Sequence, residues 1–149
     1  MMITYILQLT HGKYYVGRTN NLEKRVCDHT NGNGAAWTKK YGVIRVMETH
    51  NNDSRFFEDM LVKTMMHKYG IDNVRGGSYV QVNLPQIQYQ CLQREINGAT
   101  DKCFNCGGDH FVSNCDVVND DLSWITDLGY RMCASGIRKT KRMIDYFWG

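Results

Sequence analysis

Short apolar blocks alternate with polar and glycine-containing segments along the first third of the chain, and these blocks predict β-strands. Residues 3–9 and 13–17 are rich in β-branched and aromatic side chains, and His11-Gly12 lies between them. This arrangement predicts a β-hairpin. Residues 43–49 have a similar composition and predict a third strand.

Helix signals follow the hairpin and the third strand. Asn20 and Glu23 have the spacing of a capping box, which predicts a helix running to about His29. Asp53-Ser54 predicts the start of a longer helix that ends at Gly70. Apolar residues recur every four positions along this helix and form one stripe, made of Phe57, Leu61, Met65 and Tyr69.

The pattern is less regular after this stripe. Residues 73–79 form a glycine-rich loop, and the single proline, Pro85, predicts the start of a third helix that runs to about Ile96. Residues 97–100 are typical of a linker. Two further short helices are predicted near 120–128 and 137–147.

These elements predict an α+β fold. Residues 1–96 should form a small three-stranded antiparallel sheet flanked by helices, and a segment of this length can bury one core. Residues 97–149 should form an appendage with a different organisation.

The appendage begins with a compact group of potential metal ligands. Three cysteines and one histidine lie within thirteen residues: Cys103, Cys106, His110 and Cys115. Three thiolates and an imidazole make a complete tetrahedral set for Zn²⁺, and the segment has too little apolar surface to fold without a metal. A closed site with four protein ligands is structural, so any chemistry must lie elsewhere in the chain.

Composition limits the class of protein. The chain has 149 residues, of which 42% are hydrophobic and 22% charged, so it should fold. Clustering of three of the six cysteines with a histidine favours metal binding over disulfides, and free thiols indicate a reducing compartment. No apolar run approaches the roughly 20 residues of a membrane span, and no leader opens the chain. We therefore expect a soluble intracellular protein with no membrane partner.

Charge is distributed unevenly along the chain. The net charge is +3, with 12 basic against 8 acidic residues over 1–95 and 6 against 7 over 96–149. A basic cluster near the end of the chain is either a solvated helix face or a phosphate-binding surface. The sequence leaves both open for Arg138, Lys139, Lys141 and Arg142.

Several polar residues of the first 73 positions should lie close together. Tyr5 and Tyr15 are on paired strands, and Arg25 and His29 are one helical turn apart. Two phenols, a guanidinium, an imidazole, a carboxylate and an amide suit phosphodiester cleavage, because a carboxylate can hold Mg²⁺ and a phenol or imidazole can take a proton from water. Ordinary packing and solvated charges are the alternative explanation. The set is Tyr5, Tyr15, Arg25, His29, Glu58 and Asn73.

The order and spacing of these residues resemble the GIY-YIG nuclease family. Ile3-Thr4-Tyr5 stands where that family has Gly-Ile-Tyr, and Tyr15-Val16-Gly17 closely matches its second motif. The helix arginine, the histidine one turn later, the metal-binding glutamate and a downstream asparagine match Arg25, His29, Glu58 and Asn73. The missing first glycine and isoleucine are the main departure, and they leave the chemically important tyrosine in place.

The resemblance implies a role for each of these residues. It implies that Tyr5 is the general base, polarised by His29, and that Tyr15 positions the water or a phosphate oxygen. It further implies that Arg25 stabilises the transition state and that Glu58 binds one Mg²⁺ or Mn²⁺. Asn73 would support the site through hydrogen bonds. Phosphate or base contacts, with ordinary surface as the alternative, are expected for Arg18, Lys24, Trp37, Lys39 and Lys40.

The cysteine-histidine segment resembles the CCHC zinc knuckle of retroviral nucleocapsid proteins. Phe104 and Phe111 occupy the positions that grip unstacked bases in that family, although they are also placed to cover the metal. Three residues separate Cys106 from His110, one fewer than usual. The turn at Gly107-Gly108 must therefore be tighter than in the usual knuckle.

The sequence as a whole predicts a metal-dependent endonuclease that hydrolyses phosphodiester bonds in DNA, with one catalytic Mg²⁺ or Mn²⁺ and one structural Zn²⁺. RNA is a second possible substrate, because zinc knuckles favour single strands. The alternative is a catalytically silent nucleic-acid binding or packaging protein that retains the nuclease fold. A third interpretation is a zinc-stabilised module that contacts protein.

Overall fold

The computed structural model of the chain describes residues 1–117, so the two short helices predicted near the C-terminus and the basic residues between 138 and 142 lie outside the described residues. The elements follow one another as β1 (Ile3–Leu9), β2 (Lys13–Thr19), α1 (Leu22–Thr30), α2 (Ala36–Tyr41), β3 (Val43–Asn51), α3 (Phe57–Tyr69), β4 (Val74–Gly76) and α4 (Gln86–Ala99). Three short 3₁₀ turns, η1 (Thr10–Gly12), η2 (Ile71–Asn73) and η3 (Val112–Asn114), complete the described chain.

The sheet has four strands in the order β3-β1-β2-β4, which corrects the predicted three. The hairpin and the β1–β3 pair are antiparallel as expected, but β4 lies parallel to β2. This fourth strand is only three residues long and ends in Gly76, so it carries no alternating pattern that would reveal it. A side chain on Gly76 would overlap the carbonyl oxygen of Val16, which explains why the strand ends in glycine.

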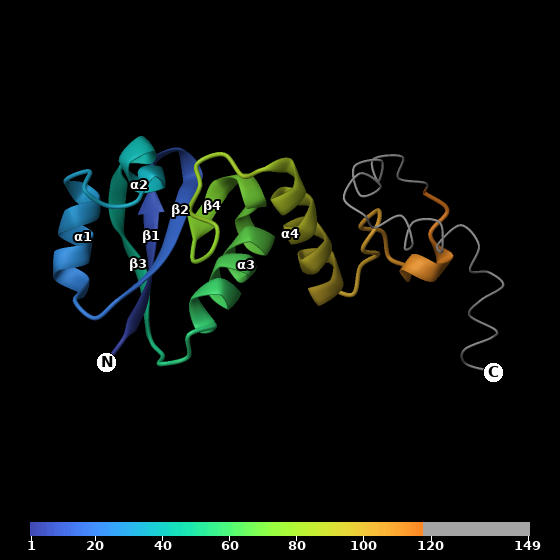
Figure 1. Cartoon of the computed structure of the whole chain (residues 1–149), viewed down its shortest axis with the longest axis horizontal. Helices are drawn as coiled ribbons and strands as arrows, with labels where there is room; N and C mark the ends of the chain where they lie inside the picture. Colours follow the sequence, from blue (N-terminus) through green and yellow to red (C-terminus); the bar gives the residue numbers. More distant parts are fainter. Residues whose placement is uncertain (118–149) are drawn as a thin grey trace, which may run out of the picture.

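Helices cover both faces of the sheet (Figure 1). On one face, Ile6 and Val16 pack against the apolar stripe of α3 and against α4. On the other face, Tyr5, Leu7 and Tyr15 pack against residues of α1 and α2. The fold is therefore α+β, as predicted, and the two motif tyrosines lie on the α1–α2 side.

The helix boundaries differ in detail from the prediction. Asn21, and not Asn20, caps α1, because its side chain accepts a hydrogen bond from the backbone N–H of Lys24. α2 was not predicted, since six residues are too few for a helical period to be recognised. α4 continues through residues 97–99, so most of the predicted linker is the last turn of this helix.

A buried arginine fixes the segment around β4. Arg75 is 3% exposed and donates to the carbonyl oxygens of Ile71, Val74, Gln81 and Val82 at 2.6–3.2 Å. Its guanidinium also lies 4.5 Å from the ring centroid of Trp37, across the sheet edge from α2. Carbonyls and an aromatic face replace the hydration that this charge loses on burial.

Within residues 1–117, no helix is both long and apolar enough to cross a membrane.

Candidate active site and zinc-binding loop

Tyr5 and Tyr15 share the α1–α2 face of the hairpin, with ring centroids 6.5 Å apart. Tyr14 points to the opposite face and stacks on Tyr69 of α3, as the alternation of a strand requires. Tyr5 is paired with Gly17 across the hairpin, and a Cβ at this glycine would lie 2.5 Å from the Tyr5 hydroxyl. The glycine of the second motif therefore makes room for the phenol of the first.

A chain of hydrogen bonds leads inward from Tyr5. Its hydroxyl lies 2.8 Å from Nε2 of His29, and Nδ1 of His29 lies 2.8 Å from the hydroxyl of Thr38. Thr38 donates its own proton to the carbonyl oxygen of Ala35 at 2.8 Å, so it must accept from His29. The proton of His29 is therefore on Nδ1, and Nε2 is free to accept the proton of Tyr5.

Local structure holds this histidine in one orientation. His29 is 1% exposed, in the last turn of α1, and a side chain on Gly34 would overlap its ring. Thr38 comes from α2, which is why sequence reasoning missed it. A threonine nine residues after the motif histidine carries no signal unless the intervening turn and helix are known.

Burial and charge set the proton affinities of these groups. Burial raises the pKa of Tyr5 to about 12, with the neighbouring Tyr15 acting in the same direction and Arg25 opposing both. The pKa of Tyr15 is also raised by burial and opposed by Arg25. Burial, assisted by Arg25, lowers the pKa of His29 to about 4. At neutral pH the phenols are protonated and His29 is neutral, so it can accept a proton.

Glu58 reaches the same region from the first turn of α3. Its Oε1 accepts a hydrogen bond from the backbone N–H of Gly77 at 3.2 Å, just beyond β4. The neighbouring Asp59 accepts from the N–H and hydroxyl of Ser78, both at 2.9 Å, so this turn is held at two points. Burial raises the pKa of the Glu58 carboxyl, and its charge raises the pKa of both Tyr5 and Tyr15.

The donor set around Glu58 fits a hard divalent cation. The carboxylate is half-buried, and only its Oε1 is engaged in the hydrogen bond with Gly77. Mg²⁺ and Mn²⁺ are commonly held by one or two carboxylates and otherwise by water and substrate oxygens. Glu58 is the residue that would hold such an ion.

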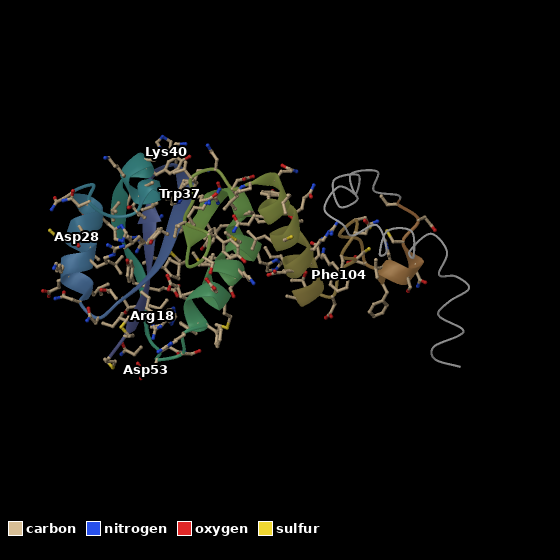
Figure 2. The ribbon with its side chains drawn as sticks, in the orientation of Figure 1. Arg18, Asp28, Trp37, Lys40, Asp53 and Phe104 are labelled. Atoms are coloured by element: carbon tan, nitrogen blue, oxygen red, sulfur yellow. The ribbon has the colours of Figure 1, made fainter. Side chains whose placement is uncertain are left out.

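Two buried polar atoms without hydrogen-bond partners face each other across the hairpin. Within residues 1–117 they are Oγ1 of Thr4 and Nε of Arg18, whereas Nε2 of His50, in the same row, lies 3.3 Å from Oε2 of Glu48. Thr4 is paired with Arg18 on one side and His50 on the other. Arg18 also donates to the carbonyl oxygen of Asp53 at 3.1 Å, and its charge lowers the pKa of Glu58 (Figure 2). Arg18 therefore lies close to Glu58, and its predicted phosphate contact stays a prediction.

Two predicted site residues have other surroundings. Trp37 is 2% exposed and donates its indole N–H to the carbonyl oxygen of Tyr14, so the prediction that it contacts nucleic acid is wrong. Figure 2 shows it inside the fold, whereas Lys40 points outward from the same helix. Asn73 lies at the far end of α3 from Glu58, where it accepts from Lys13 and donates to Tyr69. The structure therefore does not bring Asn73 to the tyrosines.

The remaining predicted contacts of the core are exposed. Lys24 lies in the first turn of α1, and Lys39 and Lys40 lie in the last turn of α2. Their ammonium groups are therefore available to phosphates.

The zinc loop, residues 103–115, brings its four potential ligands together. The ligand atoms of Cys103, Cys106, His110 and Cys115 all lie within 4.8 Å of one another. The shortened segment closes through Gly107, whose φ of +75° is accessible to glycine and whose N–H donates to the carbonyl oxygen of Cys103 at 2.8 Å. The N–H of Gly108 lies 3.4 Å from Sγ of Cys106. Three sulfurs and an imidazole in this arrangement fit Zn²⁺.

The two aromatic residues of the zinc loop differ in their surroundings. Phe104 is 50% exposed, and its ring packs so closely on Gly98 of α4 that a side chain there would overlap it (Figure 2). Phe111 is 79% exposed. Phe104 therefore attaches the loop to α4 through the Cε1 edge of its ring, while Phe111 is the freer of the two.

Comparisons with known proteins agree with this geometry. A model of the GIY-YIG catalytic domain matches residues 1–63. A UPF0213 protein of Clostridium perfringens is 31% identical over 98 residues, which are 65% of this chain and 99% of the relative. UPF0213 proteins of Halobacterium salinarum (31% over 51 residues, 34% of this chain and 66% of the relative) and Bacillus cereus (36% over 50 residues, 32% and 52%) are also similar.

These relatives' names state no activity, and no solved structure is significantly similar to the chain. The Clostridium relative is matched almost over its whole length by 98 residues, so it is about as long as the domain predicted over 1–96 and lacks an appendage of the size found here. The matched catalytic-domain model, the match over a full-length relative and the convergence of the motif tyrosines show that this chain belongs to the GIY-YIG family.

Proposed function

We propose that this protein is a metal-dependent endonuclease that hydrolyses phosphodiester bonds in DNA. The observation that supports this best is the directed chain from Tyr5 through His29 to Thr38, with the Tyr5 hydroxyl as donor and a neutral imidazole as acceptor. A buried phenol that packs for stability alone does not need a histidine whose tautomer is fixed by a second helix. Membership of a nuclease family makes a nucleic acid the expected substrate class.

The hydrogen bonds from Tyr5 to His29 and from His29 to Thr38 suggest a path for the proton. As a water molecule attacks phosphorus, it passes a proton to the oxygen of Tyr5, which passes its own proton to Nε2 of His29. The bond between phosphorus and the leaving oxygen breaks, and the leaving oxygen takes a proton from solvent. His29 later returns its proton to solvent, which its low pKa of about 4 favours. A phenol with a pKa of about 12 holds its proton at neutral pH, so Tyr5 can take a proton from water only by passing its own to His29. The low pKa of His29 makes this transfer the costly step of the path.

The other residues act on charge and position. Arg25 lies close enough to both phenols to lower their pKa, and its guanidinium would neutralise charge on the attacked phosphate. Tyr15 lies 4.9 Å from the His29 ring, between centroids, and would orient the water or a phosphate oxygen. A divalent ion bound to Glu58 would supply further charge neutralisation at the phosphate.

Substitution of neighbouring tyrosines tests the proposal. Tyr5→Phe removes the hydroxyl that starts the proton path, and we expect cleavage to fall by about 10²- to 10⁴-fold. Tyr14→Phe removes a hydroxyl on the opposite face and should change the rate less than tenfold. Rates are measured on supercoiled plasmid, branched DNA and single-stranded RNA, with and without Mg²⁺.

The outcomes separate the proposed enzyme from its alternative. Equal losses from the two substitutions would contradict the assignment of Tyr5. Binding of nucleic acid by the parent protein without cleavage of any of these substrates would favour the silent binding protein instead.

A further inference from the structure

A cleft lies at the opposite end of α3 from Glu58. It has a volume of about 560 Å³, is open to solvent, and is lined by the end of α3, by η2, by α4 and by the zinc loop. Its floor includes the buried side chains of Ile71 and Ile96, and the ring of Tyr89 lies at its wall. The cleft is within the size range of sites for ligands such as a nucleoside.

One residue joins the two walls of this cleft. Asn97, in the last turn of α4, is 8% exposed and donates from Nδ2 to the carbonyl oxygen of Cys103 at 3.4 Å. Its Oδ1 accepts from Gln93 at 3.0 Å, and its backbone carbonyl accepts from the N–H of Lys102 at 2.8 Å. Because Phe104 also packs on α4 at Gly98, the zinc loop is attached to the core on both sides of Cys103. The cleft is therefore a built feature and not a gap between independent parts.

The side chains of the cleft suit a nucleobase better than a phosphate. Gln93 uses Nε2 to bind Asn97, which leaves its Oε1 as an acceptor for a base amino group. The carboxylate of Asp72 is a second acceptor of the kind that reads such amino groups. Tyr89 presents an aromatic ring, which can stack on any base. Lys102 also lines the cleft, with its Nζ 4.0 Å from Oδ1 of Asp109, and its ammonium group can meet a backbone phosphate.

We propose that this cleft binds one unstacked base of a single-stranded nucleic acid, at a fixed distance from the point of cleavage. This inference rests on the proposed function for the identity of the substrate. Glu58 and Gly70 are twelve residues apart along α3, which corresponds to about 18 Å at 1.5 Å per residue. A strand must therefore extend about five stacked nucleotides from the cleavage point to reach the cleft, or fewer when it is more extended.

Matched substitutions on α4 test the cleft while leaving the four potential zinc ligands unchanged. Gln93→Trp would fill the cleft from its wall, whereas Gln86→Trp places the same side chain at an exposed position of the same helix that does not line it. Binding of fluorescein-labelled single-stranded oligodeoxynucleotides of 3 to 15 nucleotides is measured without added Mg²⁺. Circular dichroism and zinc content are checked for each variant.

We expect Gln93→Trp to weaken binding of the longer oligonucleotides by roughly 5- to 150-fold, the contribution of one stacked base. Binding of oligonucleotides too short to reach from the tyrosines to the cleft should change little, and Gln86→Trp should match the parent at every length. An oligonucleotide carrying 5-iodouracil should cross-link to Tyr89 on irradiation.

Other outcomes overturn the inference. Equal binding by Gln93→Trp and the parent, or cross-links confined to Phe104 and Phe111, would place the bases elsewhere. Failure of the parent to bind single strands would also contradict it. A parent that binds and cross-links at Tyr89 but cuts no substrate would contradict the proposed function alone.

Discussion

The tyrosine site, made of Tyr5, Tyr15, Arg25, His29 and Glu58, and the zinc loop are held in place by different interactions. Tyr5 and Tyr15 belong to a buried apolar cluster, and His29 is fixed by hydrogen bonds at both ring nitrogens. Among the four potential ligands of the zinc loop, only Cys103 is buried. The loop contacts α4 where Phe104 packs on Gly98 and where Asn97 donates to the carbonyl oxygen of Cys103. The geometry of the first site therefore comes from folding, whereas the second has few packing contacts of its own and would be stabilised by a metal.

This difference fits the proposed division of binding and chemistry between the two regions. The tyrosine site needs fixed distances between the phenol, imidazole and guanidinium, and a hydrophobic core provides them before any ligand arrives. The zinc loop adds a surface at the far end of α3, and a few contacts with α4 are enough to orient it. The predictions below perturb one region while observing the other.

The largest effect should come from Glu58→Ala. This change removes the carboxylate that would hold the divalent ion, and we expect cleavage to slow by about 10³-fold or more while nucleic-acid binding and fold are retained. Asp59→Ala is the matched control, because Asp59 holds the same turn through Ser78 but has no proposed metal role. Rates at saturating Mg²⁺ measure both. Similar losses of activity in the two variants would mean that these carboxylates support cleavage by holding the turn, and not by binding a metal.

A smaller loss is expected from Gly17→Ala. The added methyl would lie 2.5 Å from the Tyr5 hydroxyl, so the phenol must move away from His29. A displacement of about 1 Å can cost about 10²-fold in rate. Gly12→Ala provides the contrast, since nothing lies within 4 Å of its added methyl and its positive φ of +66° costs only stability. Full activity in Gly17→Ala would show that Tyr5 does not need its present position.

How far the sequence predicts these features depends on whether a residue carries a local pattern. The hairpin, the α3 stripe and the Cys-His spacing are periodic or have a fixed spacing, and the structure confirms them. Thr38 and Arg75 have no such pattern, because each acts through backbone carbonyls or rings that only the tertiary fold brings near. Trp37 was misassigned for the same reason, since an aromatic residue beside two lysines looks exposed until α2 packs on the sheet.

The pH dependence of stability tests the buried state of His29. Its pKa falls from 6.5 in the unfolded chain to about 4 in the folded protein. Between these values the unfolded chain binds a proton that the folded protein does not, so the free energy of unfolding decreases as pH falls from 6.5 to 4. The decrease attributable to His29 is roughly 3 kcal/mol at most.

Urea unfolding at pH 7 and pH 4.5 measures this dependence. His29→Gln should lose most of the His29 contribution, and His67→Gln, which changes an exposed histidine on α3, should retain the parent's dependence. The same decrease in all three proteins would show that other groups, such as carboxylates, control the acid sensitivity.

The smallest effect on chemistry should come from loss of zinc. Cys106→Ser removes one of four ligands, so zinc content should fall from about one ion per chain to near zero, while Cys91→Ser, at an exposed cysteine outside the cluster, should keep its zinc. The core keeps its sheet, both apolar clusters and the hydrogen bonds of His29 in Cys106→Ser, so kcat should stay within about twofold of the parent. KM should rise, because the zinc loop forms one wall of the cleft beside α4.

Zinc content is measured by elemental analysis, and kcat and KM by initial rates. A Cys106→Ser protein that is folded by circular dichroism but inactive at saturating substrate would contradict this division, since the zinc loop would then be needed to complete the tyrosine site.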